Sequence, residues 1–482
     1  MKPTMLSTCL VLLVIAPAHA IAQATSRPGY SPERFPRETI TKPATDNEQA
    51  AQKLISWTAS PASAPRPALR YRLLPALTEQ TSGNAASTYY IAAMLLREHS
   101  DAEAIDPDDW VNLPPDQFPL SEVKRFLEGD LREPLEHLDV AARRDNCDWG
   151  HPARERGYNT LLPELNSLHM LSYWLRLRTR VALIEGRYDD ALRSVQTNMA
   201  MAQHVARGRT MVNVLTAAGI ARQALDSARE LAAAPDGPNL YWSLSDLPQP
   251  AFSIRECFEF ESAALATALQ AGRLRVDLPL SGQQLSEIVD NLSRTAMSGM
   301  YVESRAALAI RAAGDLPKAR AFLLADGATA QQLDGLPPLQ VALLYYGRTL
   351  EYAIEETAKY TGLPFHIGYP RAAADTAFSD LIEANPLSML IPPQSNWPWR
   401  ALSAIDRQVA AMQVVESARA YAAAHDGKLP ASLDDLTDMP APADPFTGKP
   451  FAYKADGNTV NLSGPALSER DSPLSYRVKI SR

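Results

Sequence analysis

The sequence lacks the features that most directly mark membrane proteins and nucleic-acid-binding proteins. Beyond residue 20, no stretch approaches the roughly 18 uncharged apolar residues that indicate a membrane-spanning helix. There is no block of lysines and arginines, and the net charge of −8 opposes binding to nucleic acid or anionic lipid. We therefore expect no nucleic-acid partner and no transmembrane segment in the mature chain.

The familiar catalytic and metal-binding motifs are also missing. The chain has no HExxH, no CxxC, no G-x-S-x-G elbow and no two histidines at metal-ligand spacing. The Gly448-Lys449 pair is no phosphate-binding loop, because residue 443 is Ala where a glycine is needed and Pro450 replaces the Ser or Thr. The sequence predicts no metal and no cofactor, although folding can join distant residues into a site.

The N-terminus has the pattern of a secretory signal. Lys2 precedes an apolar run over residues 5–16, and Ala-His-Ala at 18–20 fits an A-x-A cleavage site. The run is about a dozen residues, whereas a spanning helix needs about 20, so a retained anchor is the weaker alternative. We expect a signal peptide at 1–20, cleaved after residue 20 or 24, and a mature protein that is exported and either periplasmic or extracellular.

Cysteine is scarce, with three in the chain. Cys9 leaves with the signal peptide, and Cys147 and Cys257 then share an oxidising compartment, where a lone pair is more often bridged than free. We predict a Cys147–Cys257 disulfide. Two unrelated buried thiols are the alternative, because the sequence does not set the distance between them.

Most of the mature chain has helical periodicity. After residues 21–45, which are rich in Pro, Ser and Thr and are expected to be a disordered leader, a short helix is expected at 47–57. Apolar residues then recur at intervals of three and four, and Gly is scarce. The clearest segments are 84–99, 120–143 and 165–186. The sequence predicts a mainly α fold, with a helical domain over 46–400.

Two stretches resemble the turn of tetratricopeptide-type helical hairpins. Gly186 ends one helix shortly before Tyr188 opens the next, and Gly314 and Leu316 repeat that spacing. The two glycines are 314 − 186 = 128 residues apart, which is not a multiple of the usual period of about 34. We expect stacked helical hairpins without a regular array.

One segment, 234–250, interrupts the helical pattern with four prolines. Asn239 can cap a short helix there that presents Tyr241 and Trp242. Such a rigid insert either fills the core or lines a groove.

The end of the chain changes from helical to strand periodicity. A long helix is expected at 401–425. Apolar and polar residues then alternate over 451–454 and 460–462, on either side of an Asp456-Gly457 turn, and alternate again over 474–480. The sequence predicts a small α+β module over 401–482, with three antiparallel strands on one long helix.

Two resemblances accompany this pattern. Through AYAAAHDGKLPASLDDL and DPFTGKPFAY, residues 409–462 resemble the C-terminal half of the major pseudopilins of type II secretion, where a helix runs into a Pro-containing loop and a three-stranded sheet. That family's methylated N-terminal helix and Asp-rich calcium loop have no counterpart here, so the resemblance implies neither filament assembly nor calcium binding. Blocks such as NCDWG, LRLRTR, EGRYDDA and PNLYWSLSDLP resemble a family of uncharacterised exported bacterial helical proteins, which implies export and no particular activity.

The densest cluster of polar and aromatic residues is 143–158. Loops carry function more often than helix faces, so this segment is a candidate site. The simpler interpretation is that its charged groups cap helices and pair with each other while Trp149 packs into the core. His151 and Glu155 are four residues apart, but the intervening Pro152 makes them a poor metal site.

Arg176, Arg178 and Arg180 lie in an otherwise apolar helix. They cannot all face solvent, so at least one should be buried against a carboxylate or an anion. We expect pairing with a glutamate of the ECFEFES stretch, and a pocket for an acidic ligand is the alternative. A bridge from Cys147 to Cys257 would bring these groups into one binding site. Its assigned residues are Asp148, Trp149, Arg176, Arg180, Trp242 and Glu259.

These features favour a non-enzymatic, exported helical scaffold or binding protein of the cell envelope, with an envelope protein or peptide as its partner. The alternative is a hydrolase of an exported polymer, with Asp148 or Glu259 as acid or base. A pocket that joins Asp148, Trp242 and an arginine would favour small-molecule chemistry, whereas a long open concave face would favour protein binding.

Overall fold

The computed structural model describes residues 54–98, 105–296, 305–375, 382–388, 397–467 and 473–481. The predicted signal peptide and leader lie outside these ranges. Over the described ranges the chain is mainly helical and has a small sheet formed largely by its last strands. The predicted fold class is therefore confirmed.

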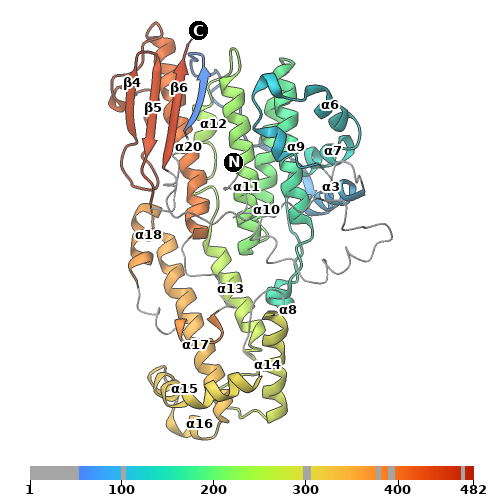
Figure 1. Cartoon of the computed structure of the whole chain (residues 1–482), viewed down its shortest axis with the longest axis vertical. Helices are drawn as coiled ribbons and strands as arrows, with labels where there is room; N and C mark the ends of the chain where they lie inside the picture. The colour runs from blue at the N-terminus through green and yellow to red at the C-terminus, as the bar shows by residue number, and fades with distance from the viewer. Residues whose placement is uncertain are drawn as a thin grey trace, which may run out of the picture.

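The helices form two lobes, one above the other in Figure 1. The bundle lobe contains α3 (Ala85–Glu98), α5 (Asp108–Val111), α6 (Leu120–Glu128), α7 (Arg132–Ala141), α9 (Glu164–Ile184), α10 (Tyr188–Ala206), α11 (Met211–Ala233) and α12 (Tyr241–Ser245). The distal lobe contains α13 (Arg255–Ala268), α14 (Gly282–Ala296), α15 (Arg305–Ala325), α16 (Ala330–Asp334) and α17 (Pro338–Ala358). Between the lobes lies α8 (Ala153–Arg156), and the 3-10 turn Gly157–Asn159 follows it.

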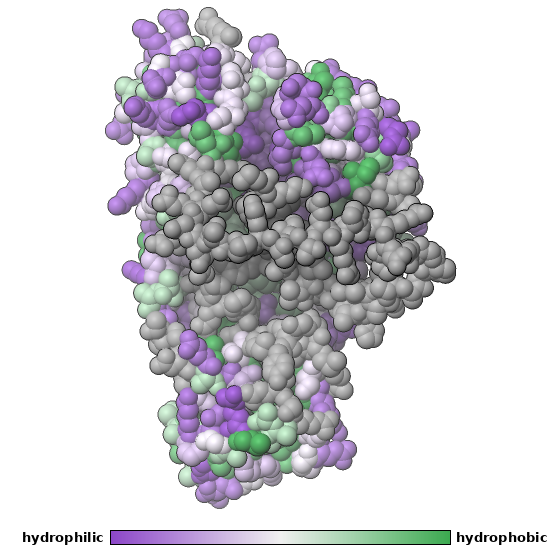
Figure 2. Space-filling model, viewed as in Figure 1, coloured by the Kyte–Doolittle hydropathy of each residue, from purple (hydrophilic) through white to green (hydrophobic). Residues whose placement is uncertain are grey.

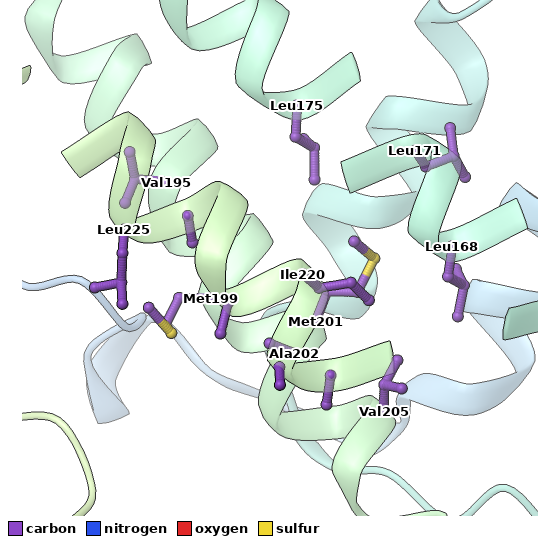
Figure 3. Packing of buried hydrophobic residues seen from close by; sticks show 14 of the residues in the cluster. Leu168, Leu171, Leu175, Val195, Met199, Met201, Ala202, Val205, Ile220 and Leu225 are labelled. Atoms are coloured by element: carbon purple, nitrogen blue, oxygen red, sulfur yellow. The ribbon is translucent and has the colours of Figure 1, made fainter. Parts of the chain in front are cut away.

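The bundle core is built from apolar stripes at helical spacing. Leu168, Leu171 and Leu175 of α9 are at most 1% exposed, and Leu175 points toward Met201 of α10 and Ile220 of α11 in Figure 3. Val195 and Met199 of α10 continue the same core. Each stripe follows the intervals of three and four residues that the sequence shows, which is why these helices were predictable.

The two predicted hairpin turns have different outcomes. At Gly186 the backbone has φ +71°, which favours glycine, and α10 begins at Tyr188, so this turn is confirmed. At Gly314 the prediction is wrong, because α15 continues through both Gly314 and Pro317. Four buried residues, Leu308, Ala312, Ala319 and Leu323, keep one apolar stripe facing the distal core across this stretch, and that packing outweighs the local turn signal.

Two other predicted helices differ from the structure. The segment 120–143 forms α6 and α7 in place of one helix, and Gly129 caps the end of α6. The helix predicted at 47–57 is also wrong where the structure describes it. Residues Ile55–Ala59 are strand β1, because strand β6 (Leu474–Ile480) of the C-terminal sheet pairs with them.

The sheet has the order β1-β6-β5-β4. The three predicted antiparallel strands are present as β4 (Ala452–Asp456), β5 (Thr459–Gly464) and β6 (Leu474–Ile480). The addition is β1, which pairs parallel with β6. A separate two-stranded ladder joins β2 (Thr81–Asn84) to β3 (Arg144–Asn146).

One long helix, α20 (Trp397–Ala424), lies between the sheet and the bundle (Figure 1). Leu402 and Ile405 belong to the bundle core, whereas Val414 and Ala418 pack in the sheet core. The helix therefore begins before the predicted boundary at 401 and is shared by both parts. The short helix α18 (Phe365–Ala374) covers the lower end of this junction in Figure 1.

The 234–250 insert fills the core. Leu240 and Leu244 are fully buried against α20, and the hydroxyl of Tyr241 donates to the carbonyl oxygen of Pro440 at 2.8 Å. Asn239 donates its amide to the carbonyl oxygen of Glu416 at 2.8 Å. The insert thus packs into the core as a structural plug, which is the first of the two expected outcomes.

The DPFTGKPF stretch ties the tail to two helices. The carboxylate of Asp444 accepts a hydrogen bond of 2.7 Å from Arg407 of α20, and both side chains are at most 5% exposed. Gly448 has φ +66° and lies against the ring of His366 on α18. The Pro and Gly residues are turn residues, and Lys449 pairs with Asp444 only through a backbone bridge.

Candidate functional site

The structure does not bring the six predicted site residues into one site. Arg176 bonds to Gln223 at 3.0 Å and to Glu230 at 3.0 Å, both on α11. Its expected partners, the glutamates at 256, 259 and 261, lie on α13 in the other lobe. The expectation of a buried arginine is confirmed, but the expected partner is wrong, because α9 packs against α11 in the bundle and the Arg176 side chain points to that helix.

The other two arginines also make structural contacts. Arg180 donates to the carbonyl oxygens of Trp110, Val111 and Leu113 at 2.7–3.1 Å, and so holds the loop after α5. Arg178 makes a two-pronged ion pair with Asp139 of α7 at 2.8 and 3.0 Å. The arginine side chains therefore connect α9 to its neighbours and form no pocket for an acidic ligand.

Trp242 and Glu259 are separate from the charged loop. Trp242 lies on α12 and contacts Tyr241 edge-on, with ring centroids 4.9 Å apart. Glu259 is exposed on α13, and its closest cation is Arg255 at 3.8 Å. Within the described ranges, no hydrogen bond, ion pair or ring contact joins either residue to Asp148.

The connecting segment, residues 147–159, runs from the end of β3 through α8 to the end of the 3-10 turn Gly157–Asn159. Trp149 is buried, stacks on Tyr89 with centroids 5.8 Å apart and donates to the carbonyl oxygen of His204 at 2.7 Å. Asp148 is exposed and accepts a hydrogen bond from the amide of Gly150 at 3.0 Å. The simpler interpretation is confirmed for Trp149, which packs into the core. For Asp148 the expected helix cap is not what the structure shows, because its carboxylate bonds to a loop amide ahead of α8.

Within this segment His151 forms a buried pair that the sequence did not indicate. Its Nε2 lies 2.9 Å from Oε1 of Glu164 at the start of α9, and the two side chains are 7% and 0% exposed. The Nδ1 of His151 and the Oε2 of Glu164 have no hydrogen-bond partner among the described residues. A histidine paired with a carboxylate is an arrangement that general acid–base catalysis uses. Here both side chains are buried, so a substrate in solvent does not reach the pair.

A polar hollow of about 200 Å³ lies where the connecting segment meets the distal lobe. Its lining consists of Glu155, Arg156, Tyr158, Asn159, Thr267, Ala268 and Asn291. Gly157, with φ +51°, allows the close approach: a Cβ there would lie 3.1 Å from the carbonyl oxygen of Ala264. The hollow therefore depends on the contact between α8, the following turn and α13.

Next to this hollow, Glu261 of α13 is 5% exposed. Burial raises the pKa of its carboxyl to about 7, and a hydrogen bond from Tyr158 offsets part of that rise. The single hydroxyl proton of Tyr158 is shared between this carboxyl and the backbone carbonyl oxygen of Glu261, which lies 3.3 Å from the Tyr158 oxygen. The sequence carried one signal for Glu261, since it lies four residues after the buried Cys257 and four before the buried Leu265.

The two cysteines are free and buried. The Sγ of Cys257 lies 3.9 Å from the carbonyl oxygen of Thr210, and burial raises the pKa of the Cys147 thiol to about 12. The structure does not contain the predicted bridge. The main reason for placing Asp148 beside Glu259 is thereby removed.

Two kinds of feature are absent from the described residues. No group of three or more His, Cys, Asp or Glu side chains in those ranges could hold a metal ion. No helix in the described part of the chain is long and apolar enough to cross a membrane. Comparison with known proteins also gave nothing: no family model, no curated protein and no solved structure matches this chain.

Proposed function

We propose that the chain is an exported binding protein of the cell envelope and that the hollow between its lobes receives a polar side chain of a protein or peptide partner. The observation that carries this proposal is the polar lining of the hollow. Thr267 and Asn291 line it with a hydroxyl and an amide that donate to the carbonyl oxygens of Ala263 and Ala268 and keep oxygen atoms that can accept. Glu155 and Arg156 are exposed at the same hollow. Export is inferred from the signal-like N-terminus alone.

The size of the hollow supports a side chain as the occupant. Sites for small molecules usually enclose about 300–1,000 Å³, and this hollow encloses about 200 Å³. A single amide, hydroxyl or charged group of a partner fits such a space, whereas a whole substrate does not. The arginines that were candidates for an acidic ligand, Arg176 and Arg180, bond internally, which also favours this location over the α9 face.

A photo-cross-linking experiment tests the proposal. Benzoyl-phenylalanine is placed at Thr267 in the full chain, expressed in its own host and irradiated. A control variant carries it at Gln331, which is exposed on α16. We expect an adduct of defined mass from position 267 and none from position 331. Equal labelling from both positions, or none from position 267, would contradict the proposal.

One observation favours the alternative, hydrolysis of an exported polymer. Glu261 is a buried carboxyl with a pKa of about 7, which suits a general acid at neutral pH, and α13 also supplies Thr267 to the hollow. The predicted acids, Asp148 and Glu259, are both exposed. Under this alternative, Glu261→Gln abolishes release of soluble fragments from envelope polymer. Under the binding proposal, the same variant keeps the position-267 adduct.

A further inference from the structure

Strand β4 is an edge strand of the four-stranded sheet. It pairs with β5 alone, and no backbone hydrogen bond from the rest of the described chain reaches its outer edge. Its side chains alternate, with Tyr453 and Ala455 half-buried toward α20 and the other three exposed. An open strand edge of this kind is a template for pairing with another chain.

The register with β5 shows which backbone groups face outward. Asp456 pairs with Thr459 across the two-residue turn Gly457-Asn458, so this pair is hydrogen-bonded. Because such pairs alternate along an antiparallel ladder, Lys454 also directs its backbone groups toward β5. The amides and carbonyls of Tyr453 and Ala455 therefore point out of the sheet.

We propose that β4 pairs antiparallel with β4 of a second copy of this chain, centred on Ala455. In this register the two Ala455 residues exchange backbone hydrogen bonds. Lys454 of each copy then lies opposite Asp456 of the other, on the exposed face of the sheet. Both contacts join opposite charges at a non-hydrogen-bonded pair, where the side chains are closest.

The other possible registers between two β4 strands place the charged side chains less favourably. Centring the pair on Lys454 sets the two lysines directly opposite, which is destabilising. Centring it on Tyr453 sets Lys454 opposite Ala452 and gains no ion pair. A lone lysine on an edge strand ordinarily discourages pairing with another strand. Here Asp456 lies two residues away on the same face, so Lys454 can pair with the Asp456 of a second copy. The spacing of these charges thus specifies the partner as a copy of the same strand.

The strand is short and the visible surface over the sheet is mostly hydrophilic (Figure 2). The pairing buries little apolar area, and interfaces below about 1,200 Å² are typically weak. We therefore expect a dimer that dissociates on dilution. Its stability depends on the two ion pairs and falls at high salt.

Sedimentation of the full chain tests this at increasing protein concentration. Wild type should dimerise reversibly, and Lys454→Asp and Asp456→Lys should each weaken the dimer about tenfold or more, because two attractive pairs become repulsive. The double variant K454D/D456K should restore wild-type association. Circular dichroism of each variant checks that the fold is kept.

Lys479→Asp is the matched control, because Lys479 is exposed on the central strand β6 of the same sheet and should leave association unchanged. A wild-type chain that stays monomeric at its highest soluble concentration would overturn the proposal. So would a dimer that tolerates both charge reversals, or a β4 edge that pairs with a foreign peptide while the chain remains monomeric.

Discussion

Glu416 and Arg419 lie one turn apart on α20 and form an ion pair of 2.9 Å, with their side chains 4% and 0% exposed. Arg419 also donates to the carbonyl oxygens of Ser60, Gly237 and Pro238 at 2.8–3.1 Å. The Oε2 of Glu416 accepts from the amide of Leu240 at 2.8 Å. One buried pair thus fixes the chain after β1 and the 234–250 plug to the same helix.

Removing the cation of this pair should be costly. In Arg419→Ala the carboxylate of Glu416 stays buried without its cation and three carbonyl groups lose their donor, so we expect a loss of about 3–5 kcal/mol in the free energy of unfolding. Urea denaturation measures it. The exposed pair Arg255–Glu259 provides the control, because Arg255→Ala should cost under about 1 kcal/mol. Equal losses in the two variants would contradict this role.

The cysteines give a direct test between sequence and structure. Since Cys147 and Cys257 are buried and free, and burial raises the pKa of both thiols, a thiol reagent should label neither in the native protein. After denaturation without a reductant, both should react. A disulfide-linked peptide containing both residues in a non-reduced digest would contradict free thiols and would support the predicted bridge.

The sequence predicted the features that depend on local periodicity. The stripe Leu168, Leu171 and Leu175 predicted α9, and the alternation through Val460 and Leu462 predicted β5, because each pattern repeats within a few residues. Strand β1 was missed, because residues 55–59 become a strand only by pairing with β6 at the other end of the chain. Its alternation is too short to outweigh a helical reading.

The candidate site was less predictable, because it depends on which elements meet. Arg176 was correctly expected to be buried against a carboxylate, but the partner lies on α11 and not on α13. Nothing near Glu164 in sequence indicates that His151 folds back onto it across two prolines. The hollow exists only where Tyr158 and Thr267 are brought together, so no local pattern contains it.

Two glycines with positive φ, Gly448 of the DPFTGKPF turn and Gly457 of the hairpin, allow backbone strain to be measured separately from steric contact with a neighbouring side chain. In Gly448→Ala the residue keeps φ +66°, and its new Cβ would lie 2.5 Å from Cδ2 of His366. Gly457 has φ +58° and nothing within 4 Å, so Gly457→Ala carries only the conformational cost of about 1–2 kcal/mol. Gly448→Ala should destabilise the protein more. In urea denaturation, adding His366→Ala should recover the excess, and no recovery would show that His366 does not restrict this turn.

The raised pKa of the Glu261 carboxyl should make the stability of the protein depend on pH, and replacing this one residue should remove that contribution. Its folded pKa of about 7 lies above the ordinary value of 4.5, so the stability it contributes is present below about pH 4.5 and is lost as the pH rises through about 7. The shift corresponds to about 3 kcal/mol, because the ionised group is buried away from water. The side chain of Glu261→Gln cannot ionise, so the free energy of unfolding of this variant, relative to that of wild type, should rise by about this amount between about pH 4 and about pH 8.

Glu259→Gln, on the exposed face of the same helix, is the control and should show no such rise. A constant difference between Glu261→Gln and wild type across this range would mean that water reaches Glu261, and the case for it as a proton donor beside the hollow would fail.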